Sequence, residues 1–191
     1  MATLSVGGTT VFDGATLQSG AVLTSATFPA GHVVQTTAVT RGTTRTNVNQ
    51  QSGYISTVVA STLTPKYDNS AIIAFMNYDV HWSGESSGDM GYALRVHKSG
   101  TGVSTTYPLG MYTSYGNSSQ YHNAYYQNGS GINQEANRYE TLILQDEDCE
   151  TTNPITYTLQ AAQYSIDSVF YFGNNTWNNY QWSVYFMEIK R

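Results

Sequence analysis

Residues 182–189 read WSVYFMEI, and this stretch decides the fold. Large apolar side chains recur at every second position, at Trp182, Val184 and Phe186, and Glu188 continues the same register. A period of two places these side chains on one face of a β-strand. The stretch therefore predicts a strand that packs one face against a core.

The same pattern recurs upstream, between clusters of turn-forming residues. Further strands are expected over residues 33–40, 54–63, 71–80, 91–98, 139–144, 155–161 and 169–172. The run at 71–80, AIIAFMNYDV, is the most apolar and is expected at the centre of a sheet. Residues 65–69 and 98–102 are expected turns, because proline fixes φ and Gly, Asp and Asn favour turn conformations.

No segment has a helical period of any length, although residues 134–139 could hold one short helical turn. About eight short strands with long connections predict an all-β protein, a jelly-roll-like antiparallel β-sandwich. The 191 residues suit a single sandwich domain at 29–191, preceded by a short segment.

The charge composition excludes several classes of partner. Charged residues make up only 11% of the chain, and 8 Lys and Arg against 13 Asp and Glu give a formal net charge of -5. A protein that binds phosphate backbones or anionic membranes needs clustered cations, and no basic run is present. No apolar run approaches the ~20 residues that span a bilayer. We therefore expect neither nucleic acid binding nor membrane insertion.

The first 28 residues differ from the rest, since they are rich in Gly, Thr and Ser and contain no Lys or Arg. Gly7, Gly8, Gly14 and Gly20 would weaken a regular strand, so an extended arm that orders on a partner is favoured over a first strand. The start lacks the basic and apolar regions of a signal peptide, so synthesis in a cytoplasm is expected. The candidate attachment residues of this arm are Val11, Phe12, Leu17, Val22 and Leu23.

Motifs for catalysis or for tight metal binding are not apparent. The chain contains no nucleophile elbow, P-loop or paired-cysteine motif, and its four histidines are widely spaced. The acidic run at 146–150 is expected to be a solvated loop, with Ca²⁺ binding as the alternative. Cys149 lies within this run, whose charges should raise the pKa of its thiol. We expect no catalytic residue and no cofactor, and a small hydrolase is the least favoured interpretation.

Aromatic residues are abundant, with 16 Tyr and 3 Trp. Such rings combine a flat apolar face with a polar edge, which suits sugar rings and protein interfaces as well as a sandwich core. Residues 110–138 are expected to form a long polar loop rich in tyrosine, and His81-Trp82 is expected where a strand meets a loop. The candidate glycan or partner contacts are Trp82, Tyr112, Tyr115, Tyr121, Tyr125, Tyr126, Trp177 and Tyr180.

Five segments, in order, resemble a domain of structural and tail-fibre-like proteins of marine and cyanobacterial phages. Residues 28–35 (FPAGHVVQ) resemble its opening phrase, and residues 63–73 resemble its strand-turn-strand around a Thr-Pro-Lys turn. Residues 94–101 are similar to a further turn, 148–159 to a hairpin, and 183–189 to the closing strand, which ends in Met-Glu-Ile. The chain departs from the family by lacking its long N-terminal fibre and by a longer acidic stretch around Cys149.

The resemblance implies a virion protein that assembles as an oligomer, with a homotrimer as the usual form. A capsid decoration or fibre-like accessory, held by residues 1–28 to other virion proteins, is the favoured function. A tail-fibre or tail-tip module that recognises host surface glycans is an alternative, and a stand-alone carbohydrate-binding module is another.

Overall fold

The computed structural model describes residues 3–6, 9–13, 16–17, 29–49, 53–86, 89–90, 92–106, 126–127, 132–163, 169–173 and 181–191. All regular structure in these residues is β-strand, which confirms the expected all-β class. The strands are β1 (Thr3–Val6), β2 (Thr9–Asp13), β3 (Thr16–Leu17), β4 (Val33–Thr36), β5 (Thr40–Gly42), β6 (Arg45–Val48), β7 (Ile55–Leu63), β8 (Ala71–Ser86), β9 (Asp89–Met90), β10 (Tyr92–Gly100), β11 (Tyr126–Gln127), β12 (Ile132–Asp146), β13 (Ile155–Gln163), β14 (Val169–Gly173) and β15 (Trp182–Ile189).

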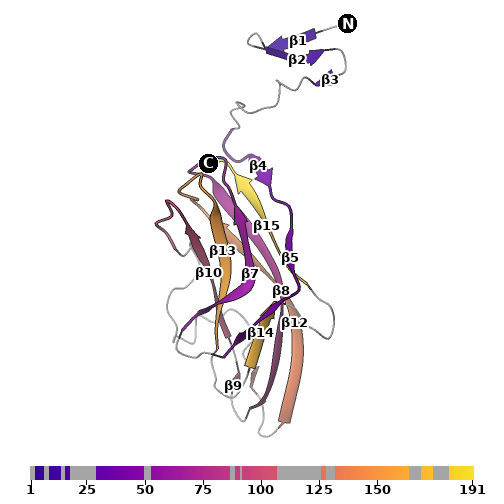
Figure 1. Ribbon diagram of the computed structural model, residues 1–191, viewed down its shortest axis with the longest axis vertical. Helices are drawn as coiled ribbons and strands as arrows, with labels where there is room; N and C mark the ends of the chain where they lie inside the picture. Colours follow the sequence, from indigo (N-terminus) through magenta and orange to yellow (C-terminus); the bar gives the residue numbers. More distant parts are fainter. Residues whose placement is uncertain are drawn as a thin grey trace.

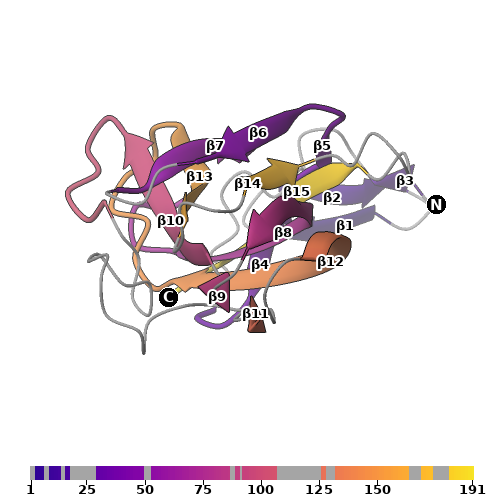
Figure 2. The same ribbon diagram turned by 90° about the horizontal axis from the view of Figure 1, so that it is seen from below.

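Two antiparallel sheets form a sandwich. The smaller sheet has the order β10-β13-β7. In the larger sheet the long β8 pairs along its length with β12 on one side, and with β15 and then β14 on the other. Strands β4 and β5 pair with β15, and β6 pairs with β14. Figure 1 shows β8 and β12 side by side, and Figure 2 shows β7 and β12 on opposite sides of the sandwich.

This strand order is that of a jelly roll. A jelly roll with strands lettered B to I has one sheet of order B-I-D-G and one of order C-H-E-F. Here β4–β6 occupy position B, β14–β15 position I, β8 position D and β12 position G. The other sheet supplies C, H and E as β7, β13 and β10. Position F falls between β10 and β12, where the structure describes only residues 101–106 and β11.

The core lies between the sheets and follows the alternation expected from the sequence. The inward positions of β15 and β13 are buried along both strands. Met76, Leu159, Phe172 and Phe186 are fully buried there or nearly so. Removing this much apolar surface from water provides the main driving force for the fold.

Several strand boundaries differ from the sequence prediction. The expected strand at 33–40 is divided, since β4 ends at Thr36 and β5 begins at Thr40. Thr37 accounts for the break, because its backbone amide donates to Phe186 O and its hydroxyl accepts from Phe186 N. The expected helical turn at 134–139 is wrong, because those residues belong to β12, which also takes residues 132–138 out of the expected loop.

Residues 3–17 form a small sheet of their own, of order β1-β2-β3, drawn above the sandwich in Figure 1. Gly7 and Gly8 lie between β1 and β2, and Gly14 lies between β2 and β3. The glycines therefore separate short strands. Within the described residues, none of these strands pairs with the sandwich.

Candidate binding site

A cavity of about 280 Å³ opens at β12, an edge strand of the larger sheet. Its walls come from β8, β10 and β12, and its lining residues are up to 64 positions apart in the sequence, from Tyr78 to Leu142. The lining residues are Tyr78, Leu94, Arg138, Tyr139, Glu140, Thr141 and Leu142.

Glu140 lies at the centre of this site. Tyr92 donates its hydroxyl to Glu140 Oε1 at 2.7 Å, and Tyr78 donates to Oε2 at 3.2 Å. Arg138 Nε lies 3.2 Å from Oε1. Both tyrosine rings are buried, and Phe170 and Phe172 pack edge-on against Tyr92 with centroids 5.3 and 5.1 Å away. The carboxylate is therefore fixed by donors that cannot easily move.

The electrostatics of the site keep both hydroxyls protonated. Burial raises the pKa of Tyr78 and of Tyr92 well above the ordinary value, and the charge of Glu140 and its hydrogen bonds raise both further. The two phenols therefore remain donors across the physiological range. Glu140 accepts both hydroxyls beside the opening.

Arg138 and Tyr139 give the site its exposed side. The Arg138 side chain is 47% exposed, and Tyr139 is 53% exposed. Within the described residues, Glu140 is the only partner that the structure gives the Arg138 guanidinium. A guanidinium presents five donors in a planar fork, so its terminal amino groups can bind oxygen pairs of a ligand. The described lining holds a single carboxylate, whereas glycoside hydrolysis generally uses two.

The acidic run at 146–150 is organised around an internal ammonium. Lys98 is fully buried, and its Nζ lies 2.8 Å from Asp146 Oδ2 and 2.6 Å from the carbonyl oxygen of Asp148. Tyr157 donates its hydroxyl to the same Asp146 oxygen at 2.6 Å. The expectation of a fully solvated loop is therefore wrong for Asp146, which is buried.

The carboxylate of Glu150 is also held by hydrogen bonds within the chain. Its carboxylate accepts the backbone amides of Ser104 and Thr105 at 2.5 and 3.1 Å. Partial burial opposes ionisation, but hydrogen bonds from Thr105 and Ser104 outweigh it and lower the pKa of Glu150 to about 2. Across the part of the chain that the structure describes, no group of three or more His, Cys, Asp or Glu side chains could hold a metal ion.

Cys149 is buried, and its thiol donates to the carbonyl oxygen of Tyr67 at 2.9 Å. Its pKa is raised, as expected, but the largest cause is burial, and Lys98 acts in the opposite direction. The flanking charges are therefore not the main reason for the low reactivity expected of this thiol.

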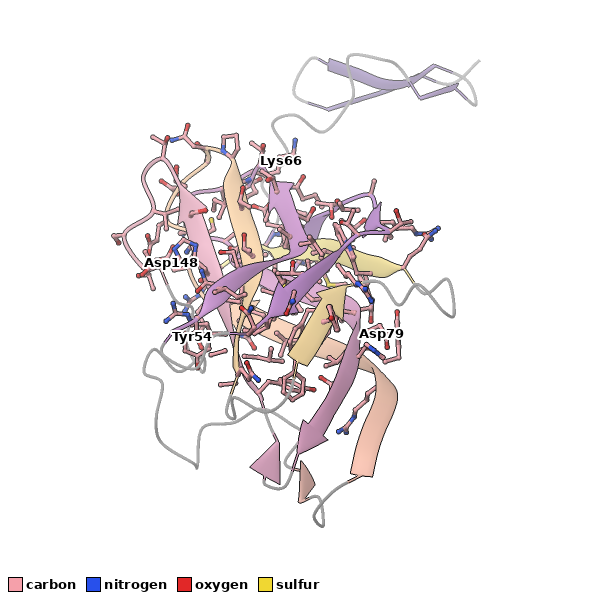
Figure 3. The ribbon with its side chains drawn as sticks, turned by 60° about the horizontal axis from the view of Figure 1, so that its bottom comes forward. Tyr54, Lys66, Asp79 and Asp148 are labelled. Carbon is pink, nitrogen blue, oxygen red and sulfur yellow. The ribbon has the colours of Figure 1, made fainter. Side chains whose placement is uncertain are left out.

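A third polar cluster surrounds Glu188, the one acidic residue on the inner face of β15. Its carboxylate accepts the backbone amides of Lys66 and Tyr67 at 2.9 and 3.1 Å, and the Ser70 hydroxyl at 2.6 Å. Gln35 Nε2 donates to it at 2.5 Å. The Glu188 cluster joins the turn at 65–70 to the final strand and therefore stabilises the fold. In Figure 3, Lys66 and Asp148 lie nearer the upper end of the sandwich, and Tyr54 and Asp79 lie below them.

The structure places few of the sequence-predicted contact residues. Trp82 lies inside β8, opposite Ala136 and Phe170, and Tyr126 lies in β11, opposite Met90. The expected strand end at His81-Trp82 is wrong, because β8 continues to Ser86 and His81 is buried, 5.6 Å from the Tyr171 ring. The remaining candidates lie outside the described residues: Tyr112, Tyr115, Tyr121, Tyr125, Trp177 and Tyr180.

Among the attachment candidates, Val11 and Phe12 lie in β2, and Leu17 lies in β3. Phe12 is opposite Leu4 in β1 and Leu17 in β3. Val22 and Leu23 lie outside the described residues.

The cavity residues Arg138 and Glu140 were missed by the sequence analysis. A signal was present, because both share the register of Leu142 and Leu144, so a longer strand would place them on the inner face. The expected strand began at residue 139 and so excluded Arg138, whereas Glu140 lay inside it but was not considered as a site residue.

No protein-family model matches the chain, and no curated protein matches it either. In the described residues, no helix is long and apolar enough to cross a membrane.

Proposed function

We propose that this chain is a non-enzymatic structural module of a bacteriophage particle, displayed on the virion surface as a capsid decoration or fibre-like accessory. The jelly roll is an architecture of viral capsid and lectin domains, so the fold suits this role without requiring it. The small sheet at residues 3–17 is the proposed attachment segment.

The phage-like phrases carry the proposal. Glu188 belongs to the closing phrase, and it binds Gln35 of the opening phrase and Lys66 and Ser70 of the turn phrase. At the same end of the sandwich, Asn153 Nδ2 of the hairpin phrase donates to the carbonyl oxygen of Thr101 at 3.2 Å. Segments up to 153 positions apart thus meet in specific contacts at one end of the sandwich. The support for the proposal is the resemblance of the phrases themselves.

Removal of residues 1–28 tests the attachment role. The truncated chain should keep a far-ultraviolet circular dichroism spectrum of β type and the same number of subunits as the full chain, because the sandwich strands remain. It should no longer join particles of the phage whose genome encodes it, as measured by mass spectrometry of purified virions. Normal incorporation of the truncated chain would show that the attachment role is wrong.

A second function, binding of a host surface glycan, is favoured by the cavity at Glu140. A half-exposed guanidinium, a fixed carboxylate and an exposed tyrosine ring are the groups that recognise sugar hydroxyls and sugar faces. A glycan array should give defined hits that are lost in Arg138→Ala. The matched control is Arg41→Ala, since Arg41 is exposed on β5, which β15 and β8 separate from β12. Equal binding by both variants would exclude this site.

A further inference from the structure

Lys98 and Asp146 connect the two sheets of the sandwich through their side chains. Lys98 is on β10 of the smaller sheet, where it is opposite Tyr157 on β13. Asp146 is the last residue of β12 in the larger sheet, where it is opposite Ile72 on β8. Because Lys98 Nζ lies 2.8 Å from Asp146 Oδ2, an amine and a carboxyl group from different sheets are already in contact.

Both side chains are withdrawn from water. The side chain of Lys98 is 0% exposed and that of Asp146 is 5% exposed. Their neighbours Ile72 and Tyr157 are fully buried as well. An ion pair in such a place is costly, because its attraction must offset the loss of hydration of both charges. A neutral product made from the same two groups would not carry that cost.

Glu150 is a second carboxylate near the ammonium group, and it is a poorer reaction partner. Its Oε1 lies 4.0 Å from Lys98 Nζ, and its side chain is 15% exposed. The backbone amides of Ser104 and Thr105 already donate to it and compensate its charge. Asp146 is therefore the carboxyl group with which Lys98 can react.

The hydrogen-bond partners that a neutral amide would need are in place around the pair. Tyr157 donates its hydroxyl to Asp146 Oδ2 at 2.6 Å, and burial together with the Asp146 charge raises the pKa of that phenol well above its ordinary value. The carbonyl oxygen of Asp148 accepts from Lys98 Nζ at 2.6 Å. An amide between the two side chains would thus have a donor for its oxygen and an acceptor for its N–H group, as a buried polar group requires.

We propose that Lys98 and Asp146 condense after folding to form an intramolecular isopeptide bond, a covalent link between the two sheets. Nζ forms a bond to Cγ of Asp146, and the Cγ–Oδ1 bond breaks. Two of the three ammonium protons leave with Oδ1 as water, and the third stays on the amide nitrogen. The charges of the ammonium and the carboxylate cancel, so no oxidant, reductant or further reactant is needed.

The fold supplies the conditions for this reaction. Reacting groups held in contact reach effective concentrations of up to about 10⁸ M. As Nζ adds to Cγ, negative charge develops on Oδ2, and the Tyr157 hydroxyl already donates to that atom. Exclusion of water then slows hydrolysis of the product. The reaction occurs once in each chain and needs no other virion protein, so it does not depend on the proposed function.

Mass spectrometry of the intact, denatured chain tests the proposal. The wild type should be lighter than the mass calculated from its sequence by one water molecule, and digestion should release a branched peptide that joins Lys98 to Asp146. Lys98→Met and Asp146→Ala should each have their calculated masses. Lys66→Met, which changes an exposed lysine, should keep the deficit. A wild type of full calculated mass, or a deficit without the branched peptide, would overturn the proposal.

The wild-type masses decide the matter even if the Lys98 and Asp146 variants fail to fold. The role of the Tyr157 hydroxyl is tested separately in Tyr157→Phe, by measuring the cross-linked fraction at intervals after synthesis. The bond should form at least about tenfold more slowly than in the wild type, because the donor to Oδ2 is lost. An unchanged rate would overturn the role given to Tyr157.

Discussion

Glu188 and Lys98 are fully buried charged residues, and each is held by a different set of partners. Glu188 is surrounded by hydrogen-bond donors of a turn and of Gln35. Lys98 is surrounded by Asp146 and backbone oxygen. A buried charge is tolerated only where its partners compensate the loss of water. Single substitutions at these residues should therefore affect stability strongly.

Glu188→Gln should lower the free energy of unfolding by about 2–3 kcal/mol. The glutamine side chain is uncharged, and its NH2 group would face donors of the 65–70 turn, so the charge-assisted hydrogen bonds of Glu188 are lost. Glu147→Gln is the matched control, since Glu147 is exposed and should change stability by less than about 0.5 kcal/mol. Urea denaturation measures both. Equal effects of the two variants would contradict the role assigned to Glu188.

Lys98→Met should lower the free energy of unfolding by about 3–5 kcal/mol, because it leaves Asp146 charged and buried without its cation. Adding Asp146→Asn should recover a large part of that loss, since the uncompensated charge is then removed. The same denaturation experiment on the single and double variants measures the recovery. A double variant less stable than Lys98→Met would indicate that the two residues act independently.

Glu150 makes stability depend on acid pH. Its pKa in the folded chain is about 2 against an ordinary value of 4.5, so its contribution is complete above pH 4.5 and is lost as the pH falls towards 2. The stability advantage of the wild type over Glu150→Gln should shrink across that window. Thermal unfolding of both proteins at a series of pH values measures it, and a constant difference down to pH 2 would contradict the assignment.

At the level of the strands, strict alternation predicted most of the sandwich. The strand at 182–189 has the expected bounds, and β7, β10, β13 and β14 differ from expectation by one or two residues at an end. β12 was predicted too short because Asn133, Gln134, Asn137 and Arg138 are polar on both faces. Pairing with β8, and not side-chain hydrophobicity, keeps residues 132–138 in the sheet.

The cavity and the buried charge clusters were harder to predict than the strands. Their residues come from strands far apart in sequence, and the alternation of one strand says nothing of which strand lies opposite. Glu188 was recognised as part of an inward register, but its partners on the 65–70 turn depend on the jelly-roll topology.

Gly173, at the end of β14, should not tolerate a side chain. Its φ is +124°, and an added Cβ would lie 2.5 Å from the carbonyl oxygen of Thr44 and 2.7 Å from Val58 Cγ2. Gly173→Ala should therefore lower the free energy of unfolding by about 2–4 kcal/mol. Gly31 also has a positive φ, +85°, but an added Cβ would contact nothing within 4 Å. Gly31→Ala should cost only about 1 kcal/mol, and equal losses in the two variants would contradict this account.

At the level of the whole molecule, one sandwich places a cavity beside the edge strand β12 and buried charged residues within its core. The alternating pattern could predict a sandwich, but not the position of this cavity, because that depends on the strand order.

The central claim is membership of a phage particle, and the composition of the particle itself tests it most directly. Quantitative mass spectrometry and cryo-electron microscopy of virions, purified from the phage whose genome encodes this chain, give the measurement. We predict that the chain is present in a fixed number of copies, with jelly-roll density on the outer surface. Absence of the chain from purified, infectious virions would contradict the account.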